Sequence, residues 1–244
     1  MVTAQAVPVL ADNYAWLLRD PASGATAIVD PADPAPVATA IDAAGGRLDL
    51  ILLTHHHADH VGGTDAVRAR YGAAVVGAAA DAPRLPKLDR AVADGDTVPL
   101  GGSAGRVIAT PGHTLGALAY YFADGGVLLC GDTLFSLGCG RLLEGSAAQL
   151  FASLRTLAAL PADTWVCCGH EYTEANARFA LAADPDNAAL RSYAEQVHAL
   201  RRAGRASLPS RLADELAANP FLRAPDVATL AKLRAQKDQF KATP

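Results

Sequence analysis

The chain of 244 residues has little of what marks several specialised classes of protein. It holds one methionine, two tryptophans and four cysteines, and only 19% of its residues are charged. The cysteines form no CxxC pair and are too few for a disulfide scaffold. No window approaches about 18 consecutive apolar residues, so no membrane-spanning helix is predicted. The N-terminus lacks a basic region followed by an apolar run, so we expect a cytoplasmic protein that contacts no membrane.

A basic excess is also missing, because 21 Lys and Arg stand against 25 Asp and Glu. A protein dedicated to nucleic acid normally carries such an excess, so we expect no nucleic-acid partner. Apolar residues are abundant, at 51%. A chain of this length buries about 70% of the surface that its unfolded form exposes, so a hydrophobic core can form without disulfides or structural metals. All four cysteines are therefore predicted to be buried free thiols: Cys130, Cys139, Cys167 and Cys168.

Short apolar runs alternate with turn residues over the first two thirds of the chain. These runs predict strands at Ala15–Arg19, Ala25–Asp30, Leu48–Thr54, Ala73–Gly77, Arg106–Thr110, Ala117–Phe122, Gly126–Cys130 and Thr164–Cys168. Helical spacing with glycine or serine at the ends predicts helices at 34–44, 61–71 and 146–160. Strands that alternate with helices indicate an α/β layered domain.

The pattern changes after Tyr172. Strand signals vanish, and helical spacing continues through Thr173–Ala183, Asn187–Ala203 and Asp226–Phe240. From Thr173 onward 11 basic residues stand against 8 acidic ones, whereas the first 172 residues have 10 against 17. An ordinary solvated helical surface explains this charge difference, so the charge alone does not indicate a function. We predict two domains, 1–172 and a helical 173–244.

The segment Thr54–His60 reads THHHADH and gathers four potential metal ligands, His55, His57, Asp59 and His60. It follows an apolar strand pattern, and α/β folds usually place their sites at the carboxyl ends of strands. His55 and His57 can chelate one ion from an extended loop, while Asp59 and His60 turn toward a second position. Zinc, iron and manganese all accept such ligands. Without a metal this clustering would cost desolvation energy for no structural gain, so we predict a metal site.

Three more candidates lie beside a glycine at the end of a predicted strand: His113, Asp132 and His170. Taken singly, each has an ordinary interpretation as a hydrogen-bonded structural residue or a turn residue. Together with THHHADH they indicate one ligand set drawn from several strand ends. Of the remaining histidines, His56 is expected to point away as a support or packing residue, and His198 to lie on a helix surface.

These motifs resemble those of the metallo-β-lactamase superfamily and, within it, the glyoxalase II or hydroxyacylglutathione hydrolase family. The resemblance covers essentially the whole chain. It is carried by DNY at 12–14, THHHADH at 54–60, TPGHT at 110–114, GDTLFSLGCGRLLEG at 131–145, GHEYT at 169–173 and RxxKDQF at 234–240. The metal motif is specific only to the superfamily, whereas CGR, KDQF and the helical tail narrow the likeness to the family.

The resemblance implies a four-layer αβ/βα metallo-β-lactamase-like sandwich as catalytic domain, followed by a helical substrate-binding domain. It implies two divalent ions, zinc first, with iron or manganese as alternatives. Asp59 and Asp132 would orient the bridging hydroxide that attacks the substrate. The implied ligands divide between the first ion (His55, His57, His113), the second ion (Asp59, His60, His170) and a bridge between them (Asp132).

The reaction so implied is hydrolysis of S-D-lactoylglutathione and related S-acylglutathiones to glutathione and D-lactate, the second step of methylglyoxal detoxification. Arg234 and Lys237, three apart on one helix face, would meet the carboxylates of this anionic thioester. Leu143 stands where relatives can carry an aromatic, so a backbone contact is expected there. A monomer is expected, with substrate contacts at Arg141, Leu143, Tyr172, Arg234 and Lys237.

Three alternatives predict different observations. A persulfide dioxygenase on a similar scaffold would hold one iron and consume oxygen, and the basic pair on the helical tail argues against it. A nuclease of the superfamily would need a basic surface or an exosite arm, which the sequence does not show. A purely structural metal normally has four ligands in a closed site, whereas seven candidates with one shared carboxylate suit an open dinuclear site.

Overall fold

The computed structural model describes residues 1–240, which fall into two compact units. Unit 1 comprises Met1–Ala109 and Gly116–Gly131, and the described part of unit 2 comprises Thr110–Leu115 and residues 132–240. The boundary predicted at residue 172 lies within unit 2 and, as a functional division, stays a prediction. The last four residues of the predicted helical domain lie outside the described part of the chain.

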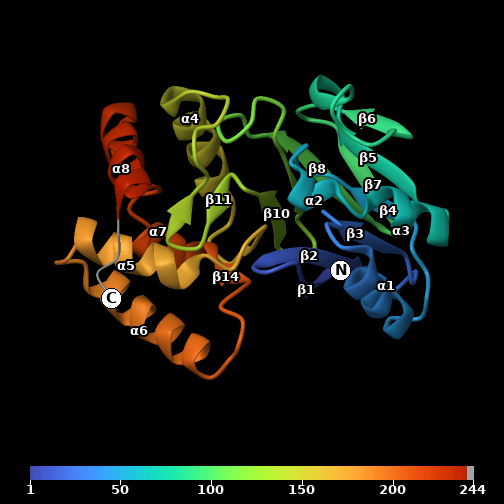
Figure 1. The fold of residues 1–244 in the computed structure, drawn as a ribbon, viewed down its shortest axis with the longest axis horizontal. Coiled ribbons are helices and arrows are strands. Elements are labelled where there is room, and N and C mark those ends of the chain that lie inside the picture. The colour runs from blue at the N-terminus through green and yellow to red at the C-terminus, as the bar shows by residue number, and fades with distance from the viewer. Residues whose placement is uncertain (241–244) are drawn as a thin grey trace. The chain divides into compact units, whose positions relative to one another are not determined.

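Unit 1 contains a mixed sheet whose strands follow in chain order: β1 (Thr3–Val9), β2 (Asn13–Arg19), β3 (Thr26–Val29), β4 (Leu50–Leu52), β5 (Ala74–Ala78) and β6 (Arg90–Val92). Strands β1 to β3 pair antiparallel, and β3 to β6 pair parallel. Helix α1 (Pro34–Ala43) lies against β1, β2 and α3 (Thr64–Tyr71), as Figure 1 shows. Strands β3, β4 and β5 are largely buried, as expected where helices cover the sheet, whereas the edge strand β6 exposes Arg90 and Ala91.

The single helix predicted at 61–71 is wrong, because the chain breaks it at Gly62 and Gly63. A short helix α2 (Ala58–Val61) comes first, and α3 begins at Thr64. A Cβ atom at Gly63 would overlap the carbonyl oxygen of Pro31, so only glycine permits this close approach. The break places Asp59 and His60 on α2, directly after the extended loop that carries the first two histidines of THHHADH.

A second sheet in unit 1 holds, in the order β10-β9-β8-β7, the strands β7 (Thr97–Leu100), β8 (Ser103–Ala109), β9 (Leu118–Phe122) and β10 (Val127–Gly131). Strand β9 is joined to the segment after β4 by two hydrogen bonds of 2.8 Å. Leu118 N donates to Thr54 O, and the Tyr120 hydroxyl donates to Leu53 O. The start of the ligand loop is thereby fixed against a buried strand.

Unit 2 is mostly helical, with α4 (Ala147–Ala158), α5 (Thr173–Ala183), α6 (Ala188–Arg202), α7 (Leu212–Ala218) and α8 (Val227–Gln239). Ser146 and Gln149 form a capping box at the start of α4. A hairpin is formed by β11 (Leu134–Phe135) and β12 (Gly138–Cys139), and β13 (Trp165–Cys168) pairs with β14 (Ser210–Arg211). The short β14 corrects the prediction that strands end at Tyr172, since two residues carry no periodic signal.

All four cysteines are buried free thiols, as predicted. Within residues 1–240, no helix is both long and apolar enough to cross a bilayer.

Candidate metal centre and substrate cavity

In unit 1 the candidate ligands pair as their spacing predicts. His55 Nε2 lies 3.0 Å from His57 Nδ1, and their rings meet edge to face. His60 Nε2 lies 3.8 Å from Asp59 Oδ2. His60 is buried on α2, whereas the Asp59 side chain is 46% exposed. Unit 1 thus offers two adjacent pairs of ligand atoms.

Asp30, which the sequence analysis missed, fixes the protonation of two of these histidines. It is buried at the end of β3, and its carboxylate accepts from Thr54 Oγ1 at 2.6 Å and faces His60 Nδ1 at 2.9 Å. Because Thr54 donates to Asp30, its oxygen accepts from His55 Nδ1 at 3.0 Å. Both rings therefore carry their proton on Nδ1 and present Nε2 as a lone-pair donor, as ligand histidines do.

Asp30 also lies among the atoms that could hold a metal together with His55 and His60. Its oxygens already accept from Thr54 and face His60 Nδ1, so we assign it to the support of the ligands.

The remaining residues around the loop have distinct tasks. Asn13 Nδ2 donates to the Asp59 carboxylate and to the Asp59 main-chain oxygen, each at 3.0 Å, which gives the DNY motif a positioning role. His56 turns to buried Asp81, 3.2 Å away, and to Arg84, 3.3 Å away. This arrangement agrees with the support role expected for His56.

In unit 2 one carboxylate faces two histidines. Asp132 Oδ2 lies 3.6 Å from His113 Nε2 and 3.3 Å from His170 Nε2. His113 Nδ1 donates to the carbonyl oxygen of Arg141 at 2.9 Å, so its Nε2 carries a lone pair. A lone pair that faces a carboxylate oxygen is repulsive unless a cation lies between them, so these residues fit a divalent metal.

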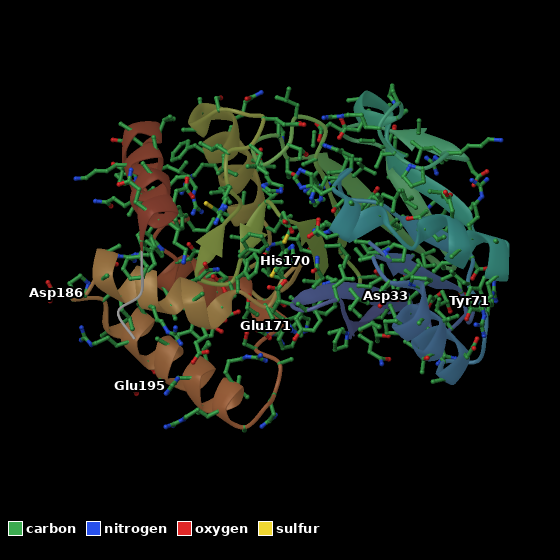
Figure 2. The ribbon with its side chains drawn as sticks, in the orientation of Figure 1. Asp33, Tyr71, His170, Glu171, Asp186 and Glu195 are labelled. Atoms are coloured by element: carbon green, nitrogen blue, oxygen red, sulfur yellow. The ribbon has the colours of Figure 1, made fainter. Side chains whose placement is uncertain are left out.

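His170 is held by aromatic contacts instead. Its ring stacks on Tyr172, with centroids 4.5 Å apart and planes at 7°, and Phe135 meets it edge-on. Figure 2 labels His170 and Glu171 at the end of the segment that leads into α5. Glu171 accepts from Ser207 N at 2.9 Å, so the residue after His170 is also anchored.

Unit 2 contains a cavity of about 430 Å³ next to Asp132. Four of the five residues predicted to bind substrate line it: Arg141, Tyr172, Arg234 and Lys237. Leu143 is not in the lining, and its side chain is 58% exposed. Its backbone N–H donates to His113 O at 3.3 Å. The sequence analysis missed four further lining residues, of which the first two lie within the quoted motif at 131–145 and the last two lie outside every motif: Phe135, Cys139, Ala175 and Asn176.

Positive charge gathers in this cavity. Burial of the Lys237 ammonium, with Arg234 and Arg141 nearby, lowers the pKa of Lys237 to about 8. Arg234 is buried, donates to Cys139 O at 2.7 Å and pairs with Asp238 at 2.9 Å. Since crowding like charges is unfavourable, the arrangement suits an anionic ligand.

Comparison with known proteins agrees with this chemistry. Residues 10–170 match the model of the metallo-beta-lactamase superfamily, and residues 171–240 match that of the hydroxyacylglutathione hydrolase C-terminus. The hydroxyacylglutathione hydrolase of Acidiphilium cryptum is 59% identical and covers 98% of this chain and 97% of its own. The chain belongs to the hydroxyacylglutathione hydrolase family. The predicted family is thereby confirmed.

Solved structures show the same fold. ETHE1 from Myxococcus xanthus has a TM-score of 0.72 and 25% identity, covering 99% of this chain and 92% of its own. TTHA1623, solved in a di-iron-bound form, has a TM-score of 0.58 and 30% identity, covering 65% of this chain and 87% of its own. The predicted fold class, a metallo-β-lactamase-like α/β sandwich with a C-terminal helical region, is confirmed.

Proposed function

We propose that this protein is a thioesterase with two divalent metal ions that hydrolyses S-D-lactoylglutathione and related S-acylglutathiones to glutathione and D-lactate, the second step of methylglyoxal detoxification. One observation in unit 2 carries the proposal. Asp132, a candidate metal ligand, lines the same cavity as the cations Arg141 and Lys237. An anionic thioester bound by those cations would lie beside the metal ligand. The 59% identical relative carries the name of this activity.

For the metals, we propose the ligand division that the family resemblance implies. His55 and His57 with His113 would hold the first ion, Asp59 and His60 with His170 the second, and Asp132 would bridge both. The paired atoms of unit 1 and the carboxylate between two histidines in unit 2 support this division. Zinc is the proposed metal, and iron or manganese would accept the same ligands.

When bound, divalent ions supply Lewis-acid chemistry, which polarises a carbonyl and lowers the pKa of water toward about 7. The protein's residues do the rest. Asn13 holds Asp59, and the carboxylates of Asp59 and Asp132 orient the attacking water. Lys237, Arg141 and Tyr172 position the glutathione part. The departing thiolate is a weak base, so it needs little help from a protein acid.

Arg234 contributes through the cavity wall. Its guanidinium already donates to Cys139 O and to Asp238, so it adds positive charge and fixes the backbone beside the substrate. Leu143 would contribute through its backbone alone.

The proposal also includes the division of labour along the chain, with residues 1–172 as the catalytic domain and 173–244 as the substrate-binding domain. The two family models divide two residues earlier, between residues 170 and 171, which supports this division. A cytoplasmic monomer is part of the proposal, and size-exclusion chromatography with light scattering tests the oligomeric state.

The decisive experiment is to follow cleavage of S-D-lactoylglutathione by the purified protein together with elemental analysis of the same sample. We expect turnover that chelation abolishes and that added zinc restores, with the fold retained in circular dichroism. Absence of turnover with two ions bound would overturn the proposal. One iron per chain with persulfide-dependent oxygen uptake would replace it with the dioxygenase alternative.

A further inference from the structure

The β11–β12 hairpin of unit 2 forms part of the cavity described above. It connects Asp132 to Arg141, and its strand residues Phe135 and Cys139 line the cavity. At its tip Leu137 has a φ of 55°, in the left-handed region that a leucine rarely occupies. Such a backbone persists only where surrounding contacts hold it.

Apolar packing holds the tip in part. The Leu137 side chain is fully buried and joins a cluster from helices α5, α6 and α7: Ala177, Ala180, Leu190, Ala194 and Ala218. The tip of the hairpin is therefore packed against helices α5, α6 and α7 of unit 2.

Hydrogen bonds to a buried carboxylate also fix the tip of the hairpin. Glu215 on α7 is 0% exposed and accepts from Leu137 N at 2.7 Å. The Asn219 side chain donates to it at 3.1 Å, and the Tyr193 hydroxyl at 3.3 Å. Tyr193 also lies 2.9 Å from the Ser136 hydroxyl. Helices α6 and α7 thus converge on the hairpin tip through Glu215.

Neighbouring amides complete the arrangement. Asn219 Nδ2 donates to Phe135 O at 3.1 Å and to Gly138 O at 3.0 Å, and Asn176 Nδ2 donates to Ser136 O at 3.0 Å. Successive main-chain groups of the hairpin are therefore bonded to helix side chains.

Burial of the Glu215 carboxylate lowers the free energy of unfolding, because the charge loses its hydration. The partners of Glu215 named above are all uncharged, and burial raises the pKa of Glu215. An apolar residue could fill the same space without the desolvation cost of a carboxylate. The carboxylate is explained by what it aligns, since only an acceptor can bind the Leu137 amide, the Asn219 amide and the Tyr193 hydroxyl together.

We propose that Glu215 is a positioning residue for substrate binding, which fixes the β11–β12 hairpin so that Phe135 and Cys139 keep the cavity shaped for the glutathione part of the thioester. This inference rests on the proposed function of the cavity. Glu215 touches no reacting atom and acts through the hairpin.

The kinetic test compares Glu215→Gln with Glu195→Gln, because Glu195 projects outward from α6 in Figure 2 and is exposed. Glutamine presents an NH₂ group to donors that need an acceptor. We expect KM for S-D-lactoylglutathione to rise about tenfold in Glu215→Gln, with kcat within about twofold and metal content unchanged. The control should match the wild type. An unchanged KM in Glu215→Gln would overturn the inference, whereas an inactive wild type would instead overturn the proposed function.

A second readout does not depend on activity. Cys139 ends the hairpin and Cys130 lies on β10 of unit 1, and both thiols are buried. We expect a thiol reagent, followed by peptide mass spectrometry, to label Cys139 at least about fivefold faster in Glu215→Gln, with Cys130 unchanged. If Glu215→Gln does not fold, Tyr193→Phe removes one donor and should show both effects more weakly. Equal labelling of Cys139 in wild type and variant would contradict a role in holding the hairpin.

Discussion

The two ligand-bearing regions are supported in different ways. Unit 1 carries its candidates within THHHADH, and side chains hold them: Asp30 acts on His60 directly and on His55 through Thr54. In unit 2 the candidates are spread from residue 113 to residue 170. There, a main-chain carbonyl holds His113, and ring stacking holds His170. The comparison indicates that two candidate ligands of unit 1 share one buried carboxylate as their support, whereas in unit 2 a main-chain carbonyl supports His113 and ring stacking supports His170.

The largest effect should come from Asp132→Ala. This change removes the carboxylate that faces both histidines of unit 2 and costs several kcal/mol of charge stabilisation, or about 10³-fold or more in kcat/KM. Elemental analysis should show loss of metal. Asp163→Ala, at an exposed position of the same unit, serves as the matched control. Asp132→Ala protein with two ions and activity within tenfold of wild type would refute a bridging role.

The next largest effect tests whether side chains support the ligands of unit 1 while the main chain supports His113 in unit 2. Asp30→Ala should lower metal affinity and activity by about 10- to 100-fold, because His60 loses its acceptor and the Thr54 hydroxyl, which accepts from His55, loses the group that orients it. Arg141→Ala should leave metal content unchanged, because only the carbonyl oxygen of Arg141 holds His113. Competitive titration with a chromogenic chelator measures both. If both variants lose metal equally, the contrast between side-chain and main-chain support is wrong.

A smaller effect is expected at the cavity cations. Lys237→Ala should raise KM about fivefold with metal content intact, since it removes a partly buried cation from the cavity proposed to bind the anionic substrate. Lys232→Ala, at an exposed position of the same helix, should leave KM unchanged. An unchanged KM in Lys237→Ala would remove Lys237 from the substrate site.

The same lysine predicts a pH dependence. Its pKa is lowered to about 8, so the ammonium is charged at pH 7 and is lost as the pH rises through 8. The wild-type KM should therefore increase above pH 8, and the increase should be absent in Lys237→Ala. Parallel pH profiles for the two proteins would assign any change in KM to another group.

The smallest effect should be that of Leu143→Ala. The side chain is exposed and lies outside the cavity lining, while its N–H bonds to His113 O from the main chain, which alanine retains. KM should change by less than about twofold. A larger rise would show that the side chain contacts substrate.

The sequence predicted the parts of the molecule that are local. THHHADH is readable because its ligands are neighbours, and most strands and helices were placed within a few residues because their apolar spacing is regular. The break at Gly62 and Gly63 was not predicted, because it follows from contact with Pro31, far away in sequence. Asp30 was missed for the same reason, since its partners Thr54 and His60 lie 24 and 30 residues away. Glu215 is more distant still, 78 residues from Leu137.

The proposed function requires two bound ions, held by the ligand residues of THHHADH together with His113, Asp132 and His170. It is tested most directly by titrating the metal-free protein with zinc while following cleavage of S-D-lactoylglutathione. We expect activity that rises until two ions are bound per chain and then levels off. Full activity at one ion per chain, or none at two, would contradict it.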